Sequence, residues 1–426
     1  MNQHAAPKNT AARVLVASLV GTAIEYFDFY IYGTAAVLVF PKLFFPQADP
    51  ATATLESLAT FGLAFFARPI GGALFGHFGD RIGRKATLVA ALMTMGPSTV
   101  AIGLLPTYET AGILAPILLA LFRFGQGLGL GGEWGGAVLL AMENAPPHKK
   151  TRYGMFPQLG APLGLFLSSI IFLLLSNGME ESDFLRYGWR IPFIASGVLV
   201  WVGLYVRMKI AETPDFQQVI KNDLRVKFPA ATIIRQYPGR LFTGIFAAAT
   251  TFLLFYLMSV FTLSWATQSL HYSRSLYLNA QILSVVFFAL GIPVAALLAD
   301  RFGRINTLIV ATGLILFFGM LFSTLFLSGN EGLLFFFQSL GMLLMGFTYG
   351  PLGTFLAEIF PAHLRYTGSS LAFNFSGIIG ASLTPYIATR LAKTMGLEYV
   401  GYYLCAFALI SLASLWAARY WKKDEV

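Results

Sequence analysis

The chain has 426 residues, of which 56% are hydrophobic and only 12% are charged, and its formal net charge is +9. A soluble globular domain carries roughly twice this share of charged residues, so the composition excludes a water-soluble protein and predicts an integral membrane protein. The single cysteine excludes an intrachain disulfide and any zinc or iron–sulfur centre built on several thiolates. We expect the excess positive charge to lie on loops at one side of the membrane, and we expect no nucleic-acid partner.

Twelve apolar stretches follow one another along the chain, each long enough to cross a bilayer as a helix. Charged and turn-forming residues separate them, and the prolines inside several of them are tolerated in membrane helices. The segment ahead of the first stretch is polar, and the stretch is too long for a signal-peptide core, so we expect it to be retained. The predicted spans are residues 14–40, 54–77, 86–105, 112–141, 153–176, 188–208, 241–268, 277–299, 306–328, 332–358, 367–392 and 398–421.

The distribution of Lys and Arg predicts the orientation of these spans, because cytoplasmic loops carry an excess of basic residues. If the N-terminus is cytoplasmic, the cytoplasmic segments hold 21 of the 29 basic residues and the outer loops hold 6. The other two lie inside predicted helices. This imbalance predicts that both termini are cytoplasmic.

The sequence after the second span is repeated after the eighth. GHFGDRIGRK (76–85) and ALLADRFGRI (296–305) place Asp80 and Asp300 220 residues apart. A second pair, ENAPPHKKTR after the fourth span and EIFPAHLR after the tenth, recurs at nearly the same distance. Two pairs at nearly one spacing predict six helices followed by six similar helices.

We therefore expect an all-α membrane protein with twelve transmembrane helices in two pseudo-symmetric six-helix bundles. The first bundle is predicted over residues 1–208 and the second over residues 241–426. The basic, polar stretch 209–240 between them is predicted to be a cytoplasmic linker.

These features resemble the major facilitator superfamily, and GDRIGRK and ADRFGRI at the half-chain spacing carry that resemblance. Three longer stretches are similar to the metabolite:proton symporters, a branch that includes shikimate, 2-oxoglutarate, citrate and proline/betaine carriers. They are GTAIEYFDFYIYG (21–33), ARPIGGALFGHFGDRIGRK (67–85) and RFGQGLGLGGEWGGA (123–137). The likeness extends over nearly the whole chain and is strongest in residues 14–200.

The resemblance implies a monomeric carrier in the cell (inner or plasma) membrane, with a central site that opens alternately to either side. The leading interpretation is proton-coupled symport of a small organic acid or related metabolite. The alternatives are a proton-coupled exporter of a metabolite or drug, working by antiport, and a facilitative uniporter. We expect the partners to be the metabolite, the proton and the lipid bilayer, with no cofactor and no metal. We do not expect an enzyme, because the five histidines and one cysteine show no ligand or triad pattern.

Five charged residues lie well inside predicted spans, all in the first half: Glu25, Asp28, Arg68, Arg123 and Glu133. An ionised side chain at the bilayer centre costs a few kcal/mol on insertion scales, so such residues normally face a cavity or one another. From their depth along the helices, at about 1.5 Å of rise per residue, we expect Arg68 to neutralise Glu133 or Glu25. The same estimate pairs Asp28 with Arg123.

We hypothesise that Asp28 is the principal proton carrier and that Arg123 tunes it, with the other three charges as further proton-coupling candidates. The resemblance supports this assignment, because Arg123, Gln126 and Gly127 match the fourth-helix Arg-x-x-Gln-Gly motif associated with proton coupling in the superfamily. The alternative is a static neutral network that holds the first bundle together.

The candidate substrate-binding residues are polar or aromatic side chains that interrupt apolar spans. They could donate hydrogen bonds to a substrate, or they could serve only to join helices. The predicted set is Arg123, Gln126, Tyr30, Gln158, Tyr256 and Asn374.

The repeated loops predict two salt-bridge clusters at the cytoplasmic side. We expect them to favour the outward-open state and to break when the inner gate opens; the alternative is that these charges only set the orientation of the spans. The first cluster is predicted to hold Asp80, Arg81 and Arg84 beside Glu143 and Arg152. The second is predicted to be weaker and to hold Asp300, Arg301 and Arg304 beside Glu358 and Arg365.

Overall fold

The first half of the chain forms six long helices in the computed structural model, which describes residues 10–222 and 226–421. The two termini, which we predict to be cytoplasmic, lie outside the described residues. The long helices are α1 (Ala11–Leu38), α3 (Pro50–Arg81), α4 (Arg84–Leu104), α6 (Leu114–Glu143), α7 (Lys150–Gly178) and α9 (Arg190–Met208). The short helices between them are α2 (Phe40–Phe44), α5 (Tyr108–Ala111) and α8 (Glu181–Asp183).

The second half repeats this arrangement, with two of its spans interrupted by π-helical turns at Leu257–Phe261 and Ile378–Ser382. The helices that make up its six spans are α12 (Pro238–Tyr256) with α13 (Thr262–Gln268), α14 (Arg274–Phe302), α15 (Arg304–Met320) with α16 (Phe322–Phe326), α17 (Glu331–Glu358), α18 (Arg365–Gly377) with α19 (Thr384–Thr394), and α20 (Glu398–Trp421). Between the halves lie α10 (Pro214–Lys221) and α11 (Pro229–Gln236).

Each predicted span coincides with one helix or with two consecutive helices. Eleven helical segments of the described chain are long and apolar enough to cross a membrane. The ninth span is the exception, because α15 has only 17 residues and α16 follows it at once. The prediction of an all-α protein with twelve membrane helices is confirmed.

Two glycines lie at sharp turns between consecutive helices, and each allows the next helix to begin almost immediately after the last one ends. Gly83, between α3 and α4, has φ of 134°, and Gly303, between α14 and α15, has φ of 92°. Side chains rarely adopt such backbone angles, so glycine is favoured at both positions. The turns bring Arg84 and Arg304 to the first residues of the following helices.

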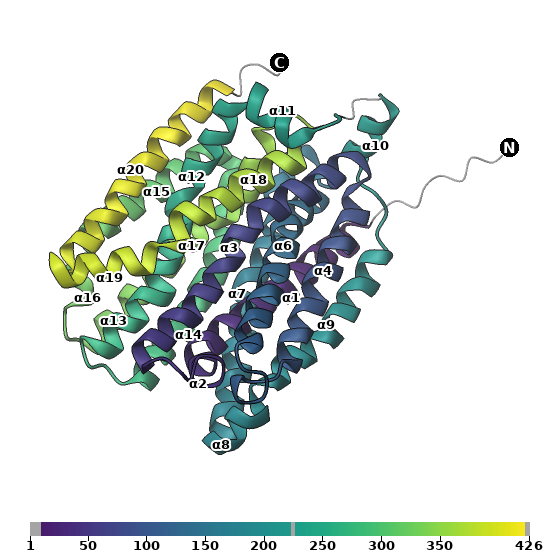
Figure 1. The fold of residues 1–426 in the computed structure, drawn as a ribbon. Coiled ribbons are helices and arrows are strands. Elements are labelled where there is room, and N and C mark those ends of the chain that lie inside the picture. Colours follow the sequence, from purple (N-terminus) through teal and green to yellow (C-terminus); the bar gives the residue numbers. More distant parts are fainter. Residues whose placement is uncertain (1–9, 223–225, 422–426) are drawn as a thin grey trace.

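The two halves meet along α3 and α7 of the first half and α14, α17 and α18 of the second. Helix α3 packs on α18, and α7 packs on α14 and α17. The rings of Trp134 on α6 and Phe373 on α18 stack across this interface with centroids 3.5 Å apart. Figure 1 shows α10 and α11 at one end of the molecule and α2 and α8 at the other. We call the end that holds residues 81–84, 301–304 and α10 the basic end.

Candidate functional site

Apart from Asp80, Arg84 and Glu143 at the basic end, six charged side chains are buried among the helices of the first half, and the sequence predicted five of them. They are Glu25 and Asp28 on α1, Arg68 on α3, Arg123 and Glu133 on α6, and Arg207 on α9. Arg207 was not predicted, because its place in the last turn of α9 gave it the position of a cytoplasmic loop charge.

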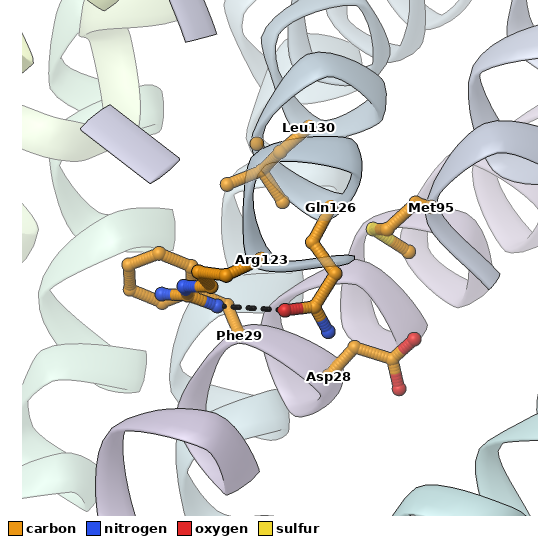
Figure 2. A pocket seen from close by; sticks show the side chains of 7 residues that line it. Asp28, Phe29, Met95, Arg123, Gln126 and Leu130 are labelled. Atoms are coloured by element: carbon orange, nitrogen blue, oxygen red, sulfur yellow. Dashed lines mark hydrogen bonds between the residues drawn. The ribbon is translucent and has the colours of Figure 1, made fainter. Parts of the chain in front are cut away.

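Asp28 and Arg123 line one small pocket together with Phe29, Met95, Gln126, Gly127 and Leu130. Arg123 donates from Nη1 to Oε1 of Gln126 at 3.0 Å, and Gln126 donates to Thr99 at 2.7 Å. Asp28 accepts a hydrogen bond from the Ser196 hydroxyl at 2.5 Å. In Figure 2 the Gln126 amide lies between the Arg123 guanidinium and Asp28.

The expected ion pair between Asp28 and Arg123 is therefore wrong for this state, since the two form no ion pair in the described chain. The guanidinium of Arg123 instead lies over the rings of Phe29, Tyr32 and Phe61, at 4.6, 4.0 and 4.8 Å from their centroids. Cation–π contacts of this kind stabilise a desolvated guanidinium. Its Nε and Nη2 atoms, and Oδ2 of Asp28, have no hydrogen-bond partner among the described residues.

Glu133 forms an ion pair with Arg207, not with Arg68 as expected. Arg207 also donates to the backbone oxygen of Leu88 at 3.0 Å. Gly21 on α1 makes room for this arginine, because a Cβ there would lie 2.1 Å from Nη2. Depth along the helix could not reveal the pair, since Arg207 reaches inward from the end of α9.

Arg68 donates from Nε to Oδ1 of Asn374 in the other half, at 3.2 Å. The rings of Phe29, Phe65 and Phe373 lie 5.7–5.8 Å from its guanidinium carbon. Of the two expected partners of Arg68, Glu133 pairs with Arg207 instead, whereas Glu25 interacts electrostatically with Arg68 but forms no hydrogen bond with it in this state.

The other predicted substrate-binding residues lie where the halves touch. Gln158 accepts from Trp134 Nε1 at 2.8 Å and donates to the backbone oxygen of Tyr349 at 2.7 Å. Asn374 donates to the backbone oxygen of Gly131 at 2.9 Å. In this closed state both amides join the two halves.

Aromatic residues continue this interface. The hydroxyls of Tyr26 and Tyr349 are hydrogen bonded to each other. Tyr30 lies 6.1 Å from Phe255 and Tyr256 lies 5.6 Å from Phe65, measured between ring centroids. The predicted aromatic candidates therefore also lie at the contact between halves.

At the basic end, the two repeated aspartates each hold the start of a helix from the opposite half. Asp80 accepts from the backbone N–H groups of Tyr366 and Thr367, at 3.3 and 3.0 Å, and from the Thr367 hydroxyl at 2.7 Å. Asp300 accepts from the backbone N–H groups of Thr151 and Arg152, both at 3.1 Å. A carboxylate is stabilised at a helix N-terminus by the free N–H groups and the helix dipole.

Ion pairs surround these contacts. Arg84 lies 3.1 Å from Asp80 and 3.4 Å from Glu143, and all three side chains are fully buried. In the second half, Arg304 lies 2.6 Å from Glu358. Arg304 also donates to the hydroxyl of Thr151 in the first half at 2.9 Å.

Arg152 and Arg365 do not lie where we expected them. Arg152 pairs with Asp300 at 3.3 Å, and Arg365 lies 3.6 Å from Glu143, so each arginine contacts the opposite half. The reason is the packing of α7 on α14 and of α18 on α3, which turns the first residues of α7 and α18 towards the other half.

Arg81 and Arg301 lie outside both clusters, which corrects the predicted sets. Each directly follows a buried or paired aspartate and is therefore turned about a quarter of a circle away from it on the helix. Both are exposed; Arg81 contacts His77 at 3.3 Å, and Arg301 lies over the ring of Phe302.

Helix α10 of the linker also contacts the clusters, which the sequence did not predict. Thr213 donates to Glu143 at 2.6 Å, and Asp215 lies 3.0 Å from Arg365. Phe216 is fully buried, with the Arg84 guanidinium 4.8 Å from its ring centroid. The Thr-Pro-Asp start, with Thr213 capping the helix and Pro214 in its first turn, is the sequence signal that could have revealed α10.

Known proteins are similar to this chain in sequence and in fold. The family described as Major Facilitator Superfamily matches residues 18–385. The chain is 54% identical to the inner membrane metabolite transport protein YhjE of Escherichia coli (strain K12), over 97% of this chain and 95% of that protein. It is 37% identical to the shikimate transporter of the same strain, over 94% of this chain and 93% of that protein.

Among solved structures, the chain is similar to the proton:xylose symporter XylE bound to 6-bromo-6-deoxy-D-glucose. The TM-score is 0.77 at 16% identity, over 96% of this chain and 95% of that chain. At this identity the likeness shows the fold alone. From the family match and the close relatives, the chain belongs to the major facilitator superfamily, as a metabolite transporter.

Proposed function

We propose that this transporter is a proton-coupled symporter of a small organic acid. The observation that carries the proposal is the pocket between α1, α4 and α6, where a buried guanidinium and a buried carboxyl group each keep unused hydrogen-bonding atoms. The free N–H groups of Arg123 suit a carboxylate, which guanidinium binds in a planar fork. The free oxygen of Asp28 can exchange a proton. The relative named as a shikimate transporter supports an acidic cargo.

In this proposal the two halves, 1–208 and 241–426, move against each other about the linker 209–240. The basic end is the cytoplasmic side, as the count of basic residues favours. Asp80 and Asp300, which cap the starts of α18 and α7 and which we call the aspartate caps, then hold the cytoplasmic side closed together with their ion pairs. This favours the outward-open state. One chain is sufficient for this cycle, so the protein works as a monomer.

Uptake of labelled shikimate, 2-oxoglutarate, citrate and betaine into energised membrane vesicles tests the proposal. We expect at least one of the acids to accumulate when the outside is acidic, and we expect a protonophore to abolish that accumulation. Glu180→Gln, a change of an exposed carboxylate, is the matched control and should leave uptake unchanged.

Two results would contradict proton symport and identify another mode. Accumulation that needs the opposite pH gradient would indicate an exporter that works by antiport. Equilibration that a protonophore does not change would indicate a facilitative uniporter.

A further inference from the structure

Glu25 is the one fully buried carboxylate of the described chain for which neither oxygen has a hydrogen-bond partner. Asp28, Glu133, Asp80 and Glu143 each have at least one. A carboxylate ion that is shut away from water without such partners is strongly disfavoured, and a neutral carboxyl group avoids most of that cost. The geometry therefore favours a protonated Glu25 in this closed state.

Charged and titratable groups face Glu25 from several helices. Arg68 on α3 interacts with it most strongly, followed by Arg207 on α9 and Asp28 on α1. Glu133 on α6 lies behind Arg207 as its ion-pair partner. The tyrosines whose electrostatic interactions include Glu25 are Tyr26, Tyr349 and Tyr366.

The two arginines near Glu25 are held in different ways. Arg207 is held inside the first half, by Glu133 and by the backbone oxygen of Leu88. These groups move together with Glu25 if the half moves as one body. Arg68 is held by Asn374, which lies on α18 of the second half and is itself fixed to the backbone oxygen of Gly131. Only the tether of Arg68 changes when the halves separate.

We propose that Asn374 is a positioning residue for proton release, which keeps Arg68 out of hydrogen-bond contact with Glu25 while the halves are closed. This inference rests on the proposed proton coupling and adds a second acid to it. When the basic end opens, α18 withdraws Asn374 and the freed guanidinium of Arg68 pairs with Glu25. The O–H bond of Glu25 breaks, its electron pair stays on the carboxylate, and the proton passes to water that enters from the basic end.

Infrared difference spectroscopy of the full-length chain in lipid nanodiscs tests this inference without a substrate. The carbonyl stretching band of a protonated carboxyl group that disappears in Glu25→Gln identifies Glu25. In Asn374→Ala we expect this band to titrate about one pH unit or more lower than in the wild type, because a nearby guanidinium favours the carboxylate. Asn374→Ser, whose hydroxyl is too short to reach Arg68, should give the same result if the alanine variant does not insert.

Two further variants show whether the shift comes from Arg68. In the double variant Asn374→Ala/Arg68→Gln, no freed cation remains, so the band should return to the wild-type pH. Gln338→Ala removes a buried amide that is bonded to the backbone oxygen of Met258 within the second half, and it should leave the band unchanged.

A band that titrates identically in the wild type and in both Asn374 variants would overturn the inference. So would the absence of any Glu25 band in the wild type over the accessible pH range. Vesicle uptake separates this failure from that of the proposed function. If the wild type accumulates an acid with protons while the Asn374 variants leave the band unmoved, only the switch is wrong; if the wild type never accumulates an acid with protons, the proton symport itself is wrong.

Discussion

Gly21 and Arg207 show how a single missing side chain can make room for a buried charge. The guanidinium of Arg207 occupies the space beside α1 that a Cβ at position 21 would fill. From there it reaches Glu133, and both side chains are almost completely buried. A buried ion pair is strongly destabilised when its geometry is lost, since the charges are then left without partners.

Gly21→Ala should therefore destabilise the protein. Removal of one partner from a buried ion pair costs roughly 3–5 kcal/mol, and we expect displacement of Arg207 to cost part of this, about 1–3 kcal/mol. Thermal unfolding in detergent measures the change as a lower Tm. Gly62→Ala is the matched control, because a Cβ at Gly62 meets nothing within 4 Å. Equal Tm values for the two variants would contradict this account of Gly21.

At the scale of elements, α10 closes the basic end by contacts to both halves. Thr213 reaches Glu143 on α6 and Asp215 reaches Arg365 on α18. Phe216 packs beneath Arg84. The linker is thus part of the closed arrangement and not only a tether between halves.

Asp215→Asn should shift the equilibrium towards a state open at the basic end. The pair between Asp215 and Arg365 is partly exposed, so its loss should destabilise the closed state by about 0.5–1 kcal/mol. This is roughly a two- to fivefold change in the equilibrium between the closed and open states. The labelling rate of a Ser370→Cys reporter, buried at the interface of the halves, measures the opening in a Cys405→Ser background. Glu109→Gln, an exposed change outside the basic end, should not alter the rate. A rate unchanged by Asp215→Asn would mean that α10 does not stabilise the closed state.

The aspartate caps give a second prediction at this scale. Asp80→Asn should impair transport while leaving membrane insertion intact, because the neutral amide holds α18 and Arg84 less strongly. Asp300→Asn should have the smaller effect. Within residues 10–222 and 226–421, no hydroxyl donates to Asp300 as Thr367 does to Asp80, and the arginine partner of Asp300 is partly exposed. Uptake rates at matched expression compare the two. Equal rates for wild type and Asp80→Asn would refute a role in gating.

The helices could be predicted from the sequence and most side-chain partners could not. Hydrophobic length determines where a span must lie, and every predicted span coincides with observed helix. Depth along a span says how high a residue lies but not which way it faces. Asp28 meets Ser196 and Arg68 meets Asn374 because of the packing of helices that are far apart in sequence. The π-helical turns after Tyr256 and Gly377 carry no sequence signal that we recognised.

At the scale of the whole molecule, the two halves have similar loops at the basic end but differ in the charged residues buried in their interior. Both carry an aspartate that caps a helix of the other half, so the closing contacts are exchanged symmetrically. All six buried charges that we assign to the central site lie in the first half. In our proposal the first half therefore carries the proton chemistry, and the second half supplies contacts such as Asn374 and Tyr349 that depend on the state of the carrier.

Proton movement that accompanies the substrate tests the central claim most directly. Addition of the transported acid to lightly buffered, de-energised cells should make the medium alkaline as protons enter with the acid. In Asp28→Asn, which cannot exchange a proton at this position, we predict no alkalinisation in these cells and no accumulation in energised vesicles. Alkalinisation and accumulation in Asp28→Asn equal to those of the wild type would contradict the account.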